Sequence, residues 1–268
     1  MSGAFKGQVL RMATTTSTHD SGLLDVLNPV FEKHTGATVR VFSKGTGAAI
    51  RLALDNGADL IFVHSRPDED RFVADGYGVN RRDVMYNDFV LVGPKDDPAR
   101  LDGGTDAAAA FSKIRHQGET GSAKFHSRGD LSGTHLREME LWRQACVRPA
   151  LLTRRDWYVQ TSGGMAETLR RANAENGYTL TDRGTWLKHK DSLGNLSLRV
   201  EGALNGGDHR LLNLYGIIAV NPIYNPDVNY ELAMAYIAFV TGLEGQKLIA
   251  HYRFNGEPCF IPDSRQAS

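Results

Sequence analysis

Residues 125–135 read FHSRGDLSGTH, a stretch in which one basic side chain, small hydroxyl residues and two glycines directly precede a helical pattern over 136–146. A helix N-terminus leaves four backbone N–H groups without intrahelical partners and carries a partial positive charge. Glycine and serine let a small oxyanion approach these donors, and Arg128 would supply a full charge. The same residues are also common in polar turns that cap an ordinary surface helix, so this reading stays open for the stretch alone.

Three other segments follow the same plan of predicted strand, polar loop and predicted helix. Residues 14–22 read TTTSTHDSG and carry six hydroxyl side chains between a strand and a helix that begins at about Leu23. SKGTG at 43–47 precedes a helix over 48–54, and TSGG at 161–164 precedes one over 165–174. One or two hydroxyls suffice to cap a helix, whereas this many indicate a shell of donors around a ligand rich in acceptors.

Alternation of strands and helices predicts an α/β fold with parallel strands in two lobes. Lobe I comprises residues 1–94 and 214–268, and lobe II comprises residues 95–213. The segment 93–98, GPKDDP, is taken as the first crossing because its prolines bar a continuing helix or central strand. Predicted strands lie at 9–13, 38–42, 60–64, 88–92, 124–127, 157–160, 196–200 and 215–220, and predicted helices at 22–34, 48–56, 68–75, 136–146, 165–174, 229–241 and 246–252.

The predicted helix over 136–146 is amphipathic. Leu136, Met139, Leu141 and Trp142 would share one side, and Arg137, Glu138, Glu140 and Arg143 would lie largely on the other.

Composition excludes several classes of function. The 268 residues include 31 basic and 31 acidic side chains, so the net charge is zero and a nucleic-acid partner, which needs a basic face, is not expected. No stretch reaches the roughly 18 apolar residues of a membrane span.

Residues 1–7 lack the apolar core of a signal peptide, which fits either a mature extracytoplasmic form or a cytosolic protein. Cys146 and Cys259 are expected to be buried thiols.

The motifs resemble the tungstate-binding component of bacterial ABC importers. The resemblance is carried by ATTTSTHDSGLL at 13–24, GTG at 45–47, DVMYNDFVLVGP at 83–94 and SRGDLSGTH at 127–135, and it extends to GYTLTDR at 177–183 and AVNP at 219–222. It implies a type II periplasmic-binding-protein fold, with two α/β lobes and the anion held in a cleft between them. It also implies a permease as partner and, as is usual in such proteins, a monomer.

Transferred residue by residue, the resemblance implies a ligand site built from donors. Arg128 would be the charge partner of the anion. This sequence departs from the family at His19 and His126, and His19 could make the affinity depend on pH. The remaining implied ligand-binding residues are Thr15, Thr16, Ser17, Thr46, Gly47, Ser132, Gly133, Thr134, Ser162, Gly163 and Gly164.

The choice of ligand follows from protonation. Tungstate and molybdate are fully deprotonated near neutral pH and match a site of donors only, whereas phosphate carries a proton and rewards an acceptor. Asp20 and Asp130 could serve as that acceptor, so a phosphate- or sulfate-binding protein of the same fold stays an alternative. We expect Asp130 to pair with Arg128 or to cap the helix instead. A cytosolic oxyanion scavenger or storage protein is the other alternative.

An enzyme is a different reading of the same loop. Ser132, His135 and Asp130 could be a nucleophile, a base and its orienting partner, but residues so close at a helix start point in different directions. No nucleophile elbow, zinc-binding helix, phosphate-binding Walker loop or dinucleotide fingerprint occurs. We therefore expect no catalytic activity, no cofactor and no metal cation.

Overall fold

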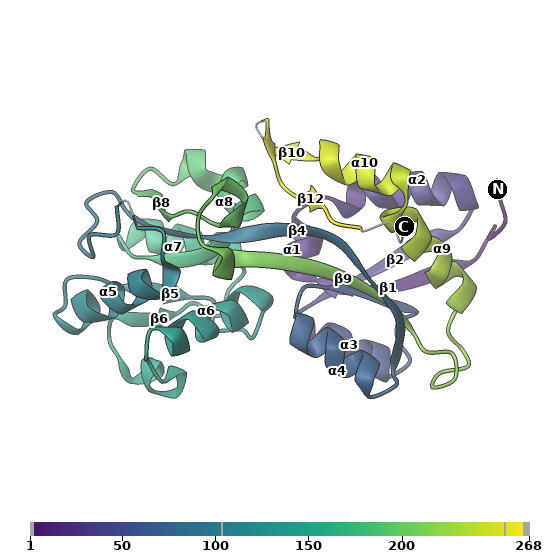
Figure 1. Ribbon diagram of the computed structural model, residues 1–268, viewed down its shortest axis with the longest axis horizontal. Helices are drawn as coiled ribbons and strands as arrows, with labels where there is room; N and C mark the ends of the chain where they lie inside the picture. Colours follow the sequence, from purple (N-terminus) through teal and green to yellow (C-terminus); the bar gives the residue numbers. More distant parts are fainter. Residues whose placement is uncertain (1–2, 103, 255, 265–268) are drawn as a thin grey trace. The chain divides into compact units, whose positions relative to one another are not determined.

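The computed structural model describes residues 3–102, 104–254 and 256–264 (Figure 1). Residue contacts divide the chain into two compact units. The first unit comprises the described residues up to Tyr86 and those from Leu214 onward, and the second comprises Asn87–Asn213. The first boundary of these units lies within strand β4, which continues without a break from Gly78 to Pro94.

The first unit is built on a mixed sheet with the strand order β12-β4-β9-β3-β1-β2. Strand β1 pairs in parallel with β2 and with β3, whereas β9 runs antiparallel to β3. Its elements in chain order are β1 (Val9–Thr15), α1 (Thr16–Asp20), α2 (Leu24–Thr35), β2 (Thr38–Lys44), α3 (Thr46–Leu54), β3 (Leu60–Val63), α4 (Arg66–Ala74), β4 (Gly78–Pro94), β9 (Leu212–Val220), α9 (Tyr230–Thr241), α10 (Leu243–His251), β10 (Arg253–Phe254), β11 (Glu257–Pro258) and β12 (Ile261–Pro262).

Both faces of this sheet are covered by helices, because its central strands are apolar on both sides. In β3, Leu60 and Phe62 belong to the core that contains residues of α2 and α9, while Ile61 and Val63 belong to the core that contains residues of α3 and α4. Successive side chains of a strand point to opposite faces, so an unbroken apolar strand requires two cores. Figure 1 shows α3 and α4 on one side of the strands and α2 and α9 on the other.

The second unit contains shorter strands and an aromatic core. Strands β7 and β8 pair antiparallel with the last residues of β4, and β5 pairs in parallel with β6. Phe111, Phe125 and Trp142 stack edge-on or tilted in its core, with ring centroids 4.5–5.3 Å apart. Its elements are α5 (Ala107–Glu119), β5 (Phe125–Ser127), α6 (Gly133–Gln144), η1 (Pro149–Arg154), β6 (Tyr158–Gln160), α7 (Met165–Ala174), β7 (Thr179–Asp182), α8 (Arg183–His189), η2 (Lys190–Ser192), β8 (Leu196–Val200), η3 (Ala203–Asn205) and η4 (His209–Leu211).

The prediction of an α/β fold is confirmed, but several local predictions are wrong. Helix α6 begins at Gly133 rather than at residue 136, because Ser132 caps it by accepting the His135 N–H group. A short helix, α1, lies inside the first polar loop, where the Thr15 side chain caps it. Cys146 is exposed rather than buried, because it follows the end of α6 in a left-handed turn with a φ of 58°.

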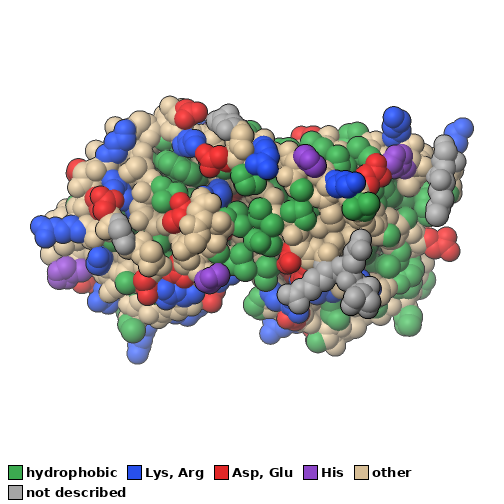
Figure 2. Space-filling model, turned by 45° about the horizontal axis from the view of Figure 1, so that its top comes forward, with side chains coloured by type: hydrophobic (Ala, Val, Ile, Leu, Met, Phe, Trp, Pro, Cys, Tyr) green, Lys and Arg blue, Asp and Glu red, His purple; other side chains and the backbone are tan. Residues whose placement is uncertain are grey.

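The surface carries both signs of charge. On the face shown in Figure 2, basic and acidic side chains are interspersed, in keeping with the net charge of zero. Among the helices that the structure describes, none combines the length and the apolar character that crossing a membrane requires.

Candidate functional site

Sheet register places the polar loops of the first unit at one edge. Thr15, at the end of β1, is the register partner of Lys44 at the end of β2, and Thr14 is the partner of Phe62 near the end of β3. Because these three strands are parallel, their carboxyl ends meet at this edge. The predicted ligand-binding residues 15–17 and 46–47 are therefore neighbours within the first unit.

Hydroxyls of the first loop bond to one another. The Thr15 Oγ1 atom lies 2.7 Å from Thr18 Oγ1 and 3.2 Å from Ser17 Oγ, and it also accepts the Thr18 N–H group at 3.3 Å. Ser17 Oγ lies 2.9 Å from Nε2 of His64, whose ring stacks on Tyr215 with centroids 4.8 Å apart. Thr15 thus shapes the loop, while Thr16 and Ser17 are half-buried.

The second loop presents donors without internal partners. Thr46 is fully buried, and its Oγ1 atom has no hydrogen-bond partner among the described residues. Helix α3 begins after Gly45 without a capping side chain. A Cβ atom at Gly45 or Gly47 would meet no atom within 4 Å, so the backbone here is open to close approach.

In the second unit, hydrogen bonds hold two more loops together. Strands β5 and β6 pair in parallel as far as Ser127 and Gln160, which puts the loops that follow them side by side. The Ser162 N–H group donates to the Arg128 carbonyl at 2.9 Å, and the Thr161 N–H group donates to that of Ser127 at 2.9 Å. Leu131 and Ser162 both have positive φ angles, 57° and 55°, which non-glycine residues rarely adopt.

Arg128, Asp130 and Ser132 form a closed network in the first of these loops. The Arg128 side chain is nearly buried and donates from Nη2 to Asp130 Oδ2 at 2.5 Å. The Ser132 N–H group donates to Asp130 Oδ1 at 3.1 Å. Burial would raise the pKa of Asp130, but the hydrogen bonds from Ser132 and the charge of Arg128 outweigh burial and lower it. The predicted role of Asp130 as partner of Arg128 and brace of the helix start is confirmed.

The remaining predicted donors of the second unit lie at the starts of α6 and α7. Thr134 is buried, and its Oγ1 atom has no partner among the described residues. Helix α7 follows Gly164 without a capping side chain, and a Cβ atom at Gly164 would meet nothing within 4 Å. Ser162 and Gly163 precede Gly164, the cap residue of α7, whereas Ser132 is itself the cap residue of α6 and Gly133 is the first residue of that helix. Each unit therefore gathers its own predicted residues.

Glu138 contacts the start of the loop through Ser127. The sequence pattern wrongly placed this residue on the polar side of its helix. It is buried, and Oε1 accepts from the Tyr158 hydroxyl at 2.7 Å and from Trp142 Nε1 at 3.1 Å. Ser127 Oγ lies 2.7 Å from Oε2. Burial raises the pKa of Glu138 to about 7, although the hydrogen bonds lower it. Leu136, predicted on the apolar side, is exposed.

Sequence reasoning missed His64 and considered His135 only as a possible base. His64 contacts Ser17, and its position directly after β3 at the shared sheet edge was the available signal. His135 is buried, and its Nδ1 atom accepts the Leu131 N–H group at 2.9 Å. His126, which departs from the family pattern, is fully buried in β5; among the described residues neither ring nitrogen has a hydrogen-bond partner, and Nε2 lies 3.9 Å from Glu175 Oε2. His19 is exposed in α1.

Geometry does not support a catalytic triad in this loop. The Ser132 Oγ atom accepts the backbone N–H of His135, and the His135 ring accepts a backbone N–H rather than a hydroxyl proton. Asp130 is engaged by Arg128 and Ser132. A triad needs a nucleophile bonded to its base and a base bonded to its orienting group, and neither bond occurs among these three residues.

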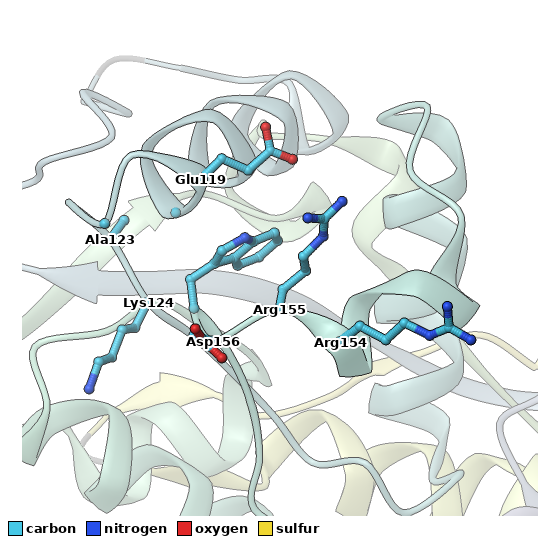
Figure 3. A pocket seen from close by; sticks show the side chains of 9 residues that line it. Glu119, Ala123, Lys124, Arg154, Arg155 and Asp156 are labelled. Atoms are coloured by element: carbon cyan, nitrogen blue, oxygen red, sulfur yellow. The ribbon is translucent and has the colours of Figure 1, made fainter.

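A large hollow on the second unit is a poor anion site. Its volume is about 700 Å³, and it is lined by residues of the end of α5 and of the segment around Trp157. In Figure 3, Lys124 and Arg154 point in different directions, and Glu119 and Asp156 lie among the basic residues. The basic side chains of this hollow do not converge, and carboxylates lie between them. Unlike the polar loops, it therefore does not present a set of donors to one anion.

Comparison with known proteins identifies the class. Residues 6–244 match the model of the PBP superfamily domain, the periplasmic-binding-protein class that the fold and the polar loops indicate. The tungstate-binding protein TupA of Peptoclostridium acidaminophilum is 43% identical over 97% of this chain and 87% of its own length. The chain therefore belongs, within that superfamily, to the family of TupA proteins.

Two further relatives agree with this assignment. A Haloferax volcanii protein named for anion binding and ABC transport is 51% identical over 98% of this chain and 74% of its own length. The solved structure of the tungstate-binding protein TupA from Desulfovibrio alaskensis G20 is 40% identical, with a TM-score of 0.82 over 97% of this chain and 100% of that chain. The expected periplasmic-binding-protein fold is thus confirmed.

Proposed function

We propose that this chain is the anion-binding component of an ABC importer, and that it binds tungstate, or else molybdate, and delivers it to the permease. Of the relatives named above, two are named as tungstate-binding proteins and one as an ABC transporter anion-binding protein, which supports the proposal. We infer that the ligand is held by Arg128 and by the hydroxyl and backbone donors of the four polar loops. The protein would act as an extracytoplasmic monomer without catalytic activity.

One observation carries the proposal: in the loop of Arg128 the carboxylate and imidazole acceptors bond within the loop, whereas three buried groups that can donate have no partner among the described residues. Both Asp130 oxygens and His135 Nδ1 accept hydrogen bonds from within their own loop. Arg128 Nε, Thr46 Oγ1 and Thr134 Oγ1 are buried without a partner among the described residues.

A buried donor without a partner costs roughly 1–3 kcal/mol, so such donors favour a ligand that brings acceptors. Tungstate and molybdate present only acceptors near neutral pH. A protonated phosphate would need an acceptor from the protein, and the loop of Arg128 keeps its own acceptors engaged.

Titration calorimetry of the ligand-free protein against tungstate, molybdate, sulfate, phosphate and vanadate tests this proposal. We expect tight binding of tungstate or molybdate and no heat from sulfate or phosphate. Binding of phosphate or sulfate alone would keep the fold and reject the ligand. Silence toward all five anions would reject the oxyanion site.

Compartment and partner need a separate measurement. Fractionation of the source cells should place the protein outside the cytoplasm, and light scattering should give the mass of one chain with or without tungstate. A cytosolic protein that still binds tungstate would favour a scavenger or storage role instead of transport.

A further inference from the structure

Leu131 occupies a backbone conformation that its side chain does not explain. Its φ is 57°, and its side chain is 67% exposed, so packing against a core does not compensate for the left-handed backbone. Left-handed backbone is unfavourable for a residue with a Cβ atom, and it persists only where the surroundings impose it. Leu131 lies between Asp130 and Ser132, in the middle of the loop that carries Arg128.

His135 supplies a hydrogen bond that can impose this conformation. Its Nδ1 atom accepts the Leu131 N–H group at 2.9 Å, and its own N–H group donates to Ser132 Oγ at 3.4 Å. The ring is nearly buried and sits in the first turn of α6. Helix α6 is packed in the core of the second unit through Leu141 and Trp142, so the ring is a fixed point from which the loop can be held.

The hydrogen bond requires an unprotonated Nδ1 atom. Burial lowers the pKa of His135, and the charge of Arg128 acts in the same direction, against the opposing effect of Asp130. The neutral ring therefore accepts the hydrogen bond from the Leu131 N–H group at Nδ1 and carries its own proton on Nε2.

We propose that His135 is a positioning residue for the oxyanion site: through Nδ1 it holds Leu131 in the left-handed conformation and thereby fixes the loop from Arg128 to Thr134. This rests on the function proposed above and adds a residue that does not touch the ligand. The bond also removes the Leu131 N–H group from the donors open to an anion. Specificity then depends on a loop geometry set before the ligand arrives, which lowers the cost of ordering it.

A matched pair of variants isolates the acceptor. His135→Asn keeps an oxygen near the place of Nδ1, and His135→Leu removes the acceptor at similar volume. We expect His135→Leu to weaken tungstate binding by about tenfold, the upper range for one neutral hydrogen bond, and His135→Asn to stay within about threefold of the unaltered protein.

Leu131→Gly provides the second arm of the test, because glycine adopts a positive φ without steric cost. Combined with His135→Leu, it should restore most of the lost affinity, whereas alone it should change affinity little. A purely structural role of the histidine would not be rescued at a different, exposed position. Equal affinities of His135→Leu and the unaltered protein, equal losses in His135→Leu and His135→Asn, or no rescue by Leu131→Gly would each overturn the proposal.

Direct observation of the ring keeps the proposal testable should His135→Leu fail to fold. Nitrogen NMR of the unaltered protein should show an unprotonated Nδ1 that is coupled to a slowly exchanging Leu131 amide. A protonated Nδ1 would overturn the proposal. Tungstate calorimetry on the unaltered protein separates the two failures: absence of binding rejects the proposed function, whereas normal binding with an indifferent His135 rejects only this inference.

Discussion

The Arg128 guanidinium and the Asp130 carboxylate lie 2.5 Å apart within one loop, and the second Asp130 oxygen accepts the Ser132 N–H group at the start of α6. Arg128 is thus fixed before any ligand binds, while its Nε atom keeps a donor without a partner among the described residues. A charged donor that is held in place loses little rotational freedom on binding. We therefore infer that Arg128 supplies the positive charge for the anion and that Asp130 holds Arg128 and the helix start in place.

Arg128→Gln should weaken tungstate binding more than any single hydroxyl deletion in the loops. Hydrogen bonds to charged groups contribute about 1.5–3 kcal/mol and neutral ones about half as much, so the expected loss is roughly 10- to 100-fold. Calorimetry would measure it against Thr134→Val, with Arg143→Gln as control because Arg143 is an exposed arginine in α6, the helix that follows the loop of Arg128. Unchanged affinity in Arg128→Gln would remove this residue from the site.

Asp130→Asn should not create or abolish phosphate binding. Each carboxylate oxygen already accepts a hydrogen bond from the loop, so the carboxylate is held against Arg128 and Ser132 and braces the loop. The asparagine oxygen can still accept the Ser132 N–H group, and loss of the negative charge favours an anion nearby. Titration of both proteins with phosphate and tungstate at neutral pH checks this. Phosphate binding that is present in the unaltered protein and absent in Asp130→Asn would contradict the assigned role.

Thr46→Val should stabilise the ligand-free protein and weaken its affinity. The buried Thr46 hydroxyl has no partner among the described residues, and replacing it with a methyl group removes an unsatisfied polar atom worth roughly 1–3 kcal/mol. The same replacement removes a donor from the proposed site. Thermal unfolding should show a higher melting temperature for the variant, and calorimetry on the same sample should show a weaker affinity for tungstate.

Thr14→Val is the matched control for Thr46→Val. Thr14 is equally buried, but its hydroxyl donates to the Phe62 carbonyl at 2.7 Å. Its replacement should therefore lower stability. A fall in melting temperature for both variants would indicate that the Thr46 hydroxyl is bonded in the ligand-free protein.

Much of the fold could be predicted from local pattern. The unbroken apolar strands and the Gly/Ser/Thr loops that follow them predicted β1, β3 and their neighbouring helices, because two-sided burial and helix starts leave clear residue signatures. Strand β4 was predicted only over 88–92, because the polar residues after Gly78 gave no strand signal and Pro94 was read as a break. Pro94 is instead the last residue of the strand, where its missing N–H group is tolerated.

Some contacts of the polar loops were not predicted, since pairing between residues far apart in sequence leaves little local signal. Ser17 meets His64 across 47 positions of sequence, and Glu138 meets Tyr158 across 20. The helical period placed Glu138 with its charged neighbours, but three buried hydrogen-bond donors on the core side favour a carboxyl group there. Whether a buried carboxyl group finds hydrogen-bond partners depends on tertiary contacts.

Glu138 and His126 should give opposite pH dependences of stability. The folded pKa of Glu138, about 7, lies above its ordinary value of 4.5, so its stabilisation is complete below 4.5 and is lost as the pH rises to 7. Burial lowers the pKa of His126 to about 4 from 6.5, although Glu175 opposes this, so its stabilisation is complete above 6.5 and is lost as the pH falls toward 4.

Two variants separate these effects. Glu138→Gln mimics the protonated acid. The free energy of unfolding of this variant minus that of the unaltered protein should increase as the pH rises from 4.5 to 7, by at most about 1.4 kcal/mol per pH unit. For His126→Phe the same difference should increase as the pH falls from 6.5 to 4. The reason is that the unaltered protein must bury a neutral ring that the unfolded chain would protonate. Urea unfolding at several pH values measures both differences, in which the other titrating groups cancel. Differences of the same sign for both variants would contradict the assigned protonation states.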